Sequence, residues 1–227
     1  MCGRFTKMYT WEELVRLYRL TDSQRSNLQP RYNICPTTEI DVVVRSEDAR
    51  LLVPMRWGLI PVWWKSLLKE FKMATFNARA ETVATTPTFR EAFKKRRCLI
   101  PASGFYEWQT IGKEKQPWYF TRKDGEPITI AGLHEAWNNP ETGERVWTCS
   151  MVITKPNKFV SEVHNRIPVI LDKKDFEQWE RGDVKDAASL MTPADDDVLQ
   201  KWTVSKRVNS SRTSDEDPSL IERIIVG

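Results

Sequence analysis

The sequence from Cys98 onward is dominated by strand-like runs, and this stretch restricts the possible folds more than any other. Residues 98–108 (CLIPASGFYEW) read as one strand. Residues 118–133 (WYFTRKDGEPITIAGL) read as two strands joined by a hairpin turn at Asp124-Gly125, and residues 146–154 (VWTCSMVIT) as a further strand. Because these strands mix with helices without a regular β-α-β alternation, the sequence predicts an α+β fold.

Helical patterns flank these strands. The first helix is predicted over 10–20, where Thr10 and Glu13 form a capping box in front of an apolar face. The remaining predicted helices lie over 87–97, 172–182 and 184–191, and the remaining predicted strands over 41–45, 49–53 and 200–205. The polar stretch 210–220 (SSRTSDEDPSL) is expected to be loop.

Composition narrows the class of protein. The chain has 227 residues, of which 40% are hydrophobic and 29% charged, so one globular domain is the simplest expectation. No apolar run is long enough to span a bilayer and the N-terminus lacks the apolar core of a signal peptide, which indicates a cytoplasmic protein. The four cysteines are scattered and the two histidines are far apart, so we expect no metal and no cofactor. The net charge of +4 permits anionic partners without requiring them.

The first residues, MCGRF, raise the possibility of a reactive N-terminus. If Met1 is removed, Cys2 carries an α-amine and a thiol on neighbouring carbons. An α-amine has a pKa of about 7.7–8.0 against about 10.4 for lysine, so at neutral pH it is the free base roughly a hundredfold more often. It can attack an aldehyde to give a Schiff base, and the thiol can then close a five-membered thiazolidine ring. Alternatively, Cys2 is an ordinary small apolar residue beside a start codon.

Three further polar positions suggest chemistry, each with a plain structural alternative. His164, in VHNRIPVIL, lies at an element boundary, where it can serve in acid–base work or simply be a buried, hydrogen-bonded side chain. Glu107 lies between aromatic residues of a strand, where burial would raise its pKa; alternatively it faces solvent. Asn77 and Arg79, in FNARAET, form a short polar cluster in which Arg79 can pair with a carboxylate or a phosphate.

The adjacent residues Trp63 and Trp64 lie in MRWGLIPVWWKS, between Gly58 and Lys65. In an extended segment neighbouring side chains point to opposite sides, so the two rings cannot both face one core. The sequence therefore favours a loop that presents a tryptophan, able to stack on nucleic-acid bases or wedge between them. The alternative is a loop folded back onto the core.

Taken in order, a series of motifs resembles one family. MCGRF, RYNICP, MRWGLIPVWW, FNARAET, RRCLIPASGFYEW, AGLHEAW, VITKPN, VHNRIPVIL and VSKRVNSSR are similar to those of the SOS response-associated peptidases, also called abasic site processing proteins. The resemblance covers almost the whole chain and fits a minimal bacterial or phage form. We expect a single domain over 1–227, with a mostly antiparallel, curved or barrel-like sheet flanked by helices and a tail from about 210 that is partly loop.

The resemblance implies a function. In that family Met1 is removed and the exposed cysteine reacts with the ring-opened aldehyde of an abasic site in single-stranded DNA, leaving a stable thiazolidine crosslink. Carried onto this chain, Cys2 would be the nucleophile and Asn77 would orient its amine or the sugar. Glu107 would transfer protons during ring opening and Schiff-base formation, and His164 would act as acid–base at the sugar or in reversal.

The resemblance also implies a DNA-binding surface and a setting. Arg4, Arg79 and Arg166 would hold phosphates. Trp63 or Trp64 would be the wedge, and Thr154 would contact the lesion backbone. The implied DNA-binding residues are Gly3, Arg4, Pro36, Trp63, Trp64, Arg79, Thr154, Arg166 and Asn209. The expected partner is single-stranded DNA with abasic sites, including junctions with duplex, bound by a monomer that joins the nucleoid. The Schiff base would also permit β-elimination, giving lyase activity.

Two other classes remain open at this stage. N-terminal-nucleophile amidohydrolases also begin with Met-Cys-Gly and attack an amide through the thiol, with the amine as base. A non-covalent single-strand-binding module would use the same basic and aromatic surface with Cys2 inert. Any peptidase activity is expected to be confined to removal of Met1.

Overall fold

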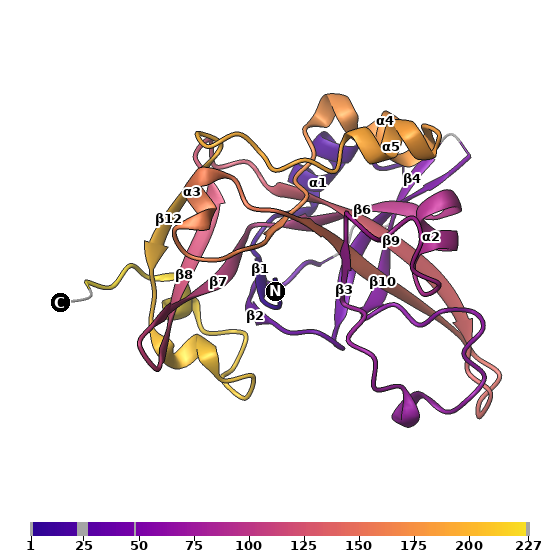
Figure 1. Cartoon of the computed structure of the whole chain (residues 1–227), viewed down its shortest axis with the longest axis horizontal. Coiled ribbons are helices and arrows are strands. Elements are labelled where there is room, and N and C mark those ends of the chain that lie inside the picture. The colour runs from indigo at the N-terminus through magenta and orange to yellow at the C-terminus, as the bar shows by residue number, and fades with distance from the viewer. Residues whose placement is uncertain (1, 22–26, 48, 226–227) are drawn as a thin grey trace.

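Two β-sheets organise the protein (Figure 1). The computed structural model describes residues 2–21, 27–47 and 49–225; Met1 lies outside them. The first sheet has five strands in the order β12-β8-β7-β1-β2, and the second follows the order β11-β10-β4-β3-β6-β9, with β5 added on β10. The strands of the first sheet are β1 (Phe5–Lys7), β2 (Arg31–Ile34), β7 (Gly104–Ile111), β8 (Glu114–Arg122) and β12 (Leu199–Thr203).

The second sheet closes on itself. Its strands are β3 (Glu39–Ser46), β4 (Ala49–Trp57), β5 (Asn77–Arg79), β6 (Arg97–Ala102), β9 (Ile128–Asn138), β10 (Arg145–Thr154) and β11 (Ile167–Pro168). Strand β10 pairs with β9 as well as with β4, so the ring β10-β4-β3-β6-β9 is continuous. Among the pairings between named strands of the described residues, only those of β10 with β4 and with β5 are parallel; the isolated bridge of Leu20 with Arg50 is parallel as well. The predicted mostly antiparallel, barrel-like sheet in a single mixed α/β domain is confirmed.

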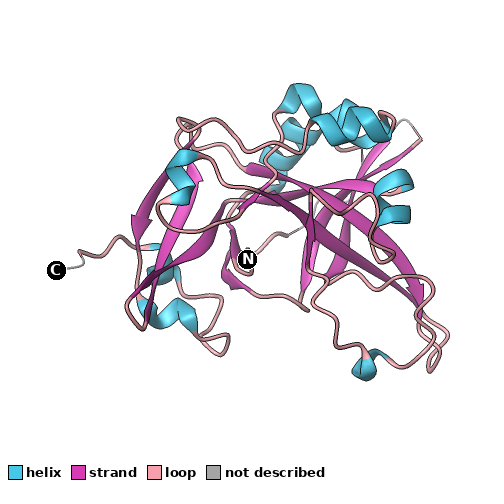
Figure 2. Cartoon of the chain, viewed as in Figure 1, coloured by secondary structure: helices cyan, strands magenta, loops and turns pink. Residues whose placement is uncertain are grey.

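Short helices and 3₁₀ turns flank the two sheets (Figure 2). They are α1 (Trp11–Tyr18), α2 (Arg90–Lys95), α3 (Lys158–Ser161), α4 (Phe176–Arg181) and α5 (Val184–Ser189), with 3₁₀ turns η1 (Leu68–Glu70), η2 (Lys173–Asp175), η3 (Lys206–Asn209) and η4 (Pro218–Ile221). The capping box of Thr10 and Glu13 starts α1 as predicted. In the part of the chain that the structure describes, none of the helices has the length and apolarity needed to cross a membrane.

Burial follows the alternation of side chains along the strands. On β7, Phe105 packs into the main core, where its ring stacks on that of Phe120, while Tyr106 faces the opposite way toward Tyr119. Glu107 is two residues after Phe105, so it lies on the core side of the same strand. This register places a carboxyl group inside the protein.

Two strand predictions were wrong in their connections. Residues 98–108 are two strands, because the chain breaks at Ser103 and β6 and β7 belong to different sheets. The turn at Asp124-Gly125 exists, with Gly125 at φ 77°, but β8 pairs with β7 and β12 while β9 pairs with β6 and β10. The period-2 pattern predicts strands but not their partners, and β9 buries side chains on both of its faces, as a strand within a closed barrel does.

The C-terminal tail is mostly loop as predicted, but it is anchored. The η4 turn buries Leu220 in a cluster with Tyr106, Tyr119, Val204 and Val208. Asp215 also pairs with Arg31 of β2, at 2.6 Å.

Candidate active site

The residues ahead of β1 run into the seam between the two sheets. Cys2 is only 2% exposed. On one side the backbone N–H of Tyr106 in β7 donates to the carbonyl of Arg4, at 3.0 Å. On the other side Asn77, at the start of β5, donates from Nδ2 to the carbonyl of Cys2, at 2.9 Å. Cys2 is therefore held between a strand of the first sheet and a strand of the barrel.

Glu107 is the buried acid of this seam. Its side chain is 1% exposed, and burial raises its pKa from 4.5 to about 7, although a hydrogen bond from the Cys2 thiol works in the opposite direction. Of the two alternatives that the sequence left open for Glu107, burial with a raised pKa is the one observed and exposure to solvent is excluded. A carboxyl group with this pKa can both give and take a proton near neutral pH.

His164 completes the cluster from the turn that follows α3. Its Nδ1 lies 3.4 Å from Oε2 of Glu107 and accepts a hydrogen bond from the backbone N–H of Arg166, at 3.2 Å. Burial, and then nearby positive charge, lower the pKa of the imidazole below its ordinary value, so the ring is neutral at pH 7. The contact with Glu107 is therefore not an ion pair at pH 7.

The Cys2 thiol is kept protonated. Burial first, and then the charge and hydrogen bond of Glu107, raise the pKa of the thiol well above its usual value. A thiol in this state is a poor first nucleophile, whereas chemistry that starts at the α-amine does not require a thiolate. The structure thus brings Cys2, Asn77, Glu107 and His164 together and favours amine-first chemistry over a thiolate mechanism.

The structure distinguishes the two neighbouring tryptophans. Trp64 packs its ring edge-on against Phe71, with centroids 5.2 Å apart, and its Nε1–H donates to the carbonyl of Leu67. Its own carbonyl accepts from Nε1 of Trp137, which fastens the loop to the barrel. Trp63, by contrast, is 48% exposed. The loop folds back through Trp64 and presents Trp63, beside the exposed Val62, Lys65, Lys69, Lys72 and Met73.

The three arginines assigned to phosphates differ in their surroundings. Arg4 donates to Oδ1 of Asn33 and to the carbonyl of Val208, at 2.6 and 2.5 Å, so its guanidinium holds β2 against η3. Arg166 pairs with Glu81 at 2.6 Å. Arg79 is exposed and makes no ion pair with any residue that the structure describes. Of the three, Arg79 is the most available to an incoming phosphate.

Two of the remaining predicted DNA contacts, Thr154 and Asn209, are hydrogen-bonded within the protein. Thr154 is 6% exposed and its hydroxyl donates to the carbonyl of Met191. Asn209 accepts at Oδ1 from Nε1 of Trp108, at 2.7 Å, and donates to the carbonyl of Lys115. These side chains therefore have packing roles, and their part in DNA binding stays a prediction. Gly3 and Pro36 are partly exposed beside the start of β1 and the end of β2.

One contact of the cluster escaped the sequence analysis. Glu81 reaches Arg166 across 85 positions of sequence, and no local pattern signals a pairing over that separation. The only hint is that Glu81 is the one acid of the FNARAET motif.

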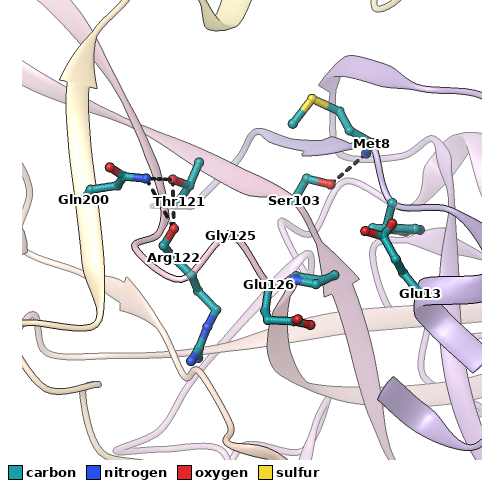
Figure 3. Close-up of a pocket in the computed structure, with 10 residues that line it drawn as sticks. Met8, Glu13, Ser103, Thr121, Arg122, Gly125, Glu126 and Gln200 are labelled. Carbon is teal, nitrogen blue, oxygen red and sulfur yellow. Dashed lines mark hydrogen bonds between the residues drawn. The ribbon is translucent and has the colours of Figure 1, made fainter. Parts of the chain in front are cut away.

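The described residues also form a cavity whose polar groups bond to one another. A cavity of about 230 Å³ lies between β8, the start of α1 and the loop before β9 (Figure 3), away from the Cys2 cluster. Its polar groups bond within the protein: Ser103 accepts from the backbone N–H of Met8, and Gln200 donates to Thr121. Within residues 2–21, 27–47 and 49–225, no three His, Cys, Asp or Glu side chains lie close enough to share a metal ion.

Comparison with known proteins identifies the family. The sequence model of the SOS response associated peptidase (SRAP) family matches residues 1–211. The chain belongs to the SRAP family. It is 36% identical to the abasic site processing protein YoqW of Bacillus subtilis, over 98% of this chain and 99% of that protein. It is also 31% identical to the abasic site processing protein HMCES of Xenopus tropicalis, over 90% of this chain and 69% of that protein.

A solved structure has a similar fold. The crystal structure of a protein from Bacteroides thetaiotaomicron superposes with a TM-score of 0.88 at 26% identity, covering 99% of this chain and all of that one.

Proposed function

We propose that this protein senses abasic sites in single-stranded DNA and, once Met1 is removed, forms a covalent thiazolidine crosslink to the lesion through Cys2. The observation that carries the proposal is the convergence of Asn77, Glu107 and His164 on the seam that holds Cys2. The names of its relatives, abasic site processing proteins, point to the same lesion.

The chemistry begins at the sugar. The closed abasic deoxyribose must open to its aldehyde, which requires removal of the proton of the C1′ hydroxyl and delivery of a proton to the ring oxygen. Glu107 in its acid form gives its proton to the ring oxygen and takes the C1′ hydroxyl proton on its other carboxyl oxygen, so it ends the step still protonated. The neutral ring of His164 donates a hydrogen bond to the sugar through its N–H. Asn77 holds the carbonyl of Cys2 and so orients the residue that carries the nucleophile.

The crosslink then forms in two steps. The α-amine of Cys2 attacks C1′, the carbonyl oxygen takes a proton from Glu107, and loss of water leaves an imine. The thiol next adds to the imine carbon; its proton passes through Glu107 to the nitrogen, which becomes the secondary amine of the ring. The raised pKa of the thiol keeps it protonated until this second step, and ring closure is favoured because it is intramolecular.

The surface is suited to bind DNA of any base sequence. The net charge of +4 supplies backbone affinity, the exposed Trp63 offers a stacking platform, and Arg79 is available to a phosphate. An abasic site lacks its base, so no flipping cost opposes access to C1′. A wedge at Trp63 would favour unpaired strands and their junctions with duplex. We expect a monomer that acts in the cytoplasm and joins the nucleoid when bound.

Two further activities are connected with the α-amine of Cys2. The imine permits β-elimination and strand cleavage, although fast ring closure by the thiol should make crosslinking the main outcome. Removal of Met1, by an aminopeptidase or by the protein itself, is the one peptidase reaction that the mechanism requires.

The central test is covalent trapping. The processed protein, with loss of Met1 checked by intact mass, is incubated with single-stranded DNA bearing one abasic site and then denatured with heat and detergent. We expect a stable shifted band that disappears in Cys2→Ala and persists in Cys35→Ala, the control at a half-buried cysteine. No band with the processed wild-type protein would overturn the proposal.

Further variants assign the individual roles. Cys2→Ser should give a link that heat destroys, because a hydroxyl closes a weaker ring; a heat-stable link would remove the thiol from the mechanism. Alanine at Glu107 or His164 should slow formation or reversal by about 10²–10⁴ while non-covalent binding survives.

The two rival classes predict other results. An amidohydrolase would release ammonia from glutamine and form no link to DNA, but the raised pKa of the Cys2 thiol disfavours that chemistry. A purely non-covalent module would bind DNA equally well with Cys2→Ala, and salt would abolish all of its binding.

A further inference from the structure

The ion pair of Glu81 and Arg166 joins two segments that carry site residues. Glu81 follows β5, which begins at Asn77, and Arg166 is two residues after His164. Oε1 of Glu81 and Nη1 of Arg166 are 2.6 Å apart. We propose that Glu81 is a positioning residue, which holds Arg166 and through it fixes the orientation and tautomer of His164 beside Glu107. The activity readout below rests on the proposed function; the spectroscopic readout does not.

Nδ1 of His164 has one neighbour that donates a hydrogen bond to it and two that would accept a proton from it. The backbone N–H of Arg166, at 3.2 Å, needs a lone pair on Nδ1. The carbonyl of Arg166 and Oε2 of Glu107, each at 3.4 Å, would accept a proton from it. The shorter contact belongs to the N–H donor, so Nδ1 presents its lone pair and the neutral ring carries its proton on Nε2.

This tautomer determines which of the two groups, Glu107 or Nδ1 of His164, carries a proton that lies between them. With a lone pair on Nδ1, the proton in the contact between His164 and Glu107 belongs to Glu107. The carboxyl group is then kept in the acid form that the first steps of the proposed chemistry require. If the turn rotated so that the N–H of Arg166 pointed elsewhere, Nδ1 could take that proton and leave a carboxylate.

Glu81 is suited to prevent this rotation because its own segment is rigid. The N–H of Ala80 donates to the carbonyl of Ile153 in the barrel, and the N–H of Val83 donates to the carbonyl of Arg79, at 2.8 and 2.9 Å. Residues 162–166, by contrast, are turn and irregular backbone between α3 and β11. The side chains of Glu81 and Arg166 are 37% and 22% exposed, so solvent screens the pair less than a fully exposed one.

The state of Glu81 agrees with this role. Partial burial would raise its pKa, but hydrogen bonds from its own backbone N–H and from Arg166 outweigh burial and lower the pKa below its ordinary value. Glu81 is therefore ionised at neutral pH, as an ion pair requires.

The first test uses nitrogen NMR of the histidine rings in the free protein. The chain has only two histidines, and His134, whose pKa burial lowers to about 4, gives a neutral internal reference. We expect a single His164 tautomer protonated at Nε2 in the wild type and a mixture in Glu81→Ala, with Glu81→Asp partly restoring the wild-type signal. An unchanged tautomer in Glu81→Ala would overturn the proposal.

The matched control is Glu162→Ala. Glu162 lies in the same turn and also pairs with a cation, Lys201, but it does not contact Arg166. Glu162→Ala removes one cation-paired carboxylate, as Glu81→Ala does, without touching the pair of Glu81 and Arg166, so the tautomer of His164 should stay as in the wild type.

The second test separates rate from affinity. Binding is measured on single-stranded DNA with a tetrahydrofuran abasic analogue, which has no aldehyde, and the crosslinking rate on the true lesion. We expect Glu81→Ala to slow crosslinking by about ten- to a hundredfold with Kd unchanged or lower. A lower Kd with an unchanged or faster rate would mean that Glu81 only competes with phosphate for Arg166. A parallel loss of rate, affinity and thermal stability would mean a purely structural role.

The two proposals fail in distinguishable ways. Absence of any crosslink with the wild-type protein would refute the proposed function, and the NMR comparison would still decide the role of Glu81.

Discussion

The buried carboxyl of Glu107 should cost the protein stability, and Glu107→Gln should recover it. The folded pKa is raised from 4.5 to about 7, so between these values the native state holds a proton that the unfolded chain has released. A raised carboxyl pKa contributes stability that is fully present below the unfolded value and is lost as pH rises through the folded value. At about 1.36 kcal/mol per pKa unit, the loss amounts to about 3 kcal/mol, undiminished by solvent because the side chain is 1% exposed. Glutamine has nearly the same shape and cannot ionise.

The assay is urea unfolding of wild type and Glu107→Gln at pH 5 and pH 8, without DNA. The free energy of unfolding of the variant relative to wild type should rise with pH, by up to about 3 kcal/mol. His164, whose pKa is lowered, acts in the opposite direction, but it is present in both chains and largely cancels. Glu114→Gln serves as the control, because Lys206 lowers the pKa of that exposed carboxyl and its removal brings no gain at high pH. A variant no more stable than wild type at pH 8 would refute the reasoning.

Two more predictions concern the DNA-binding surface. Trp63→Ala should weaken binding to single-stranded DNA by about 1–3 kcal/mol and leave the thermal midpoint unchanged, because its ring is exposed; Trp64→Ala should lower the midpoint, since its ring packs on Phe71. Equal effects of the two on affinity, measured by fluorescence anisotropy, would contradict this. Arg79→Ala should reduce the slope of log K against log salt by about 1, and an unchanged slope would show that Arg79 contacts no phosphate.

Local signals in the sequence predicted the elements well. The capping box at Thr10, four of the five described α-helices and most strands follow from apolar spacing and turn residues, which act over a few positions; α3 was not predicted. Pairing was harder: the break at Ser103 and the separation of β8 from β9 depend on which faces find a partner, and alternation along one strand does not encode that.

For the candidate site, too, some properties follow from local sequence and others depend on distant segments. Alternation with aromatic residues indicated a raised pKa for Glu107, but the choice between Trp63 and Trp64 required the contacts of Phe71 and Leu67. The internal roles of Arg4 and Asn209 also depend on segments about a hundred or more positions away. Side-chain chemistry was therefore predictable, and side-chain availability was not.

The seam that holds Cys2 also makes it a reporter of local opening. Cys2 precedes β1 of the five-stranded sheet and is bonded to Asn77 at the start of β5 in the barrel, so in the chain that retains Met1 the thiol stays covered while these segments remain docked. A soluble alkylating reagent can react with this thiol only during a transient separation. When closing is faster than alkylation, the labelling rate at Cys2 measures the free energy of that separation, at the one place where the chemistry depends on it.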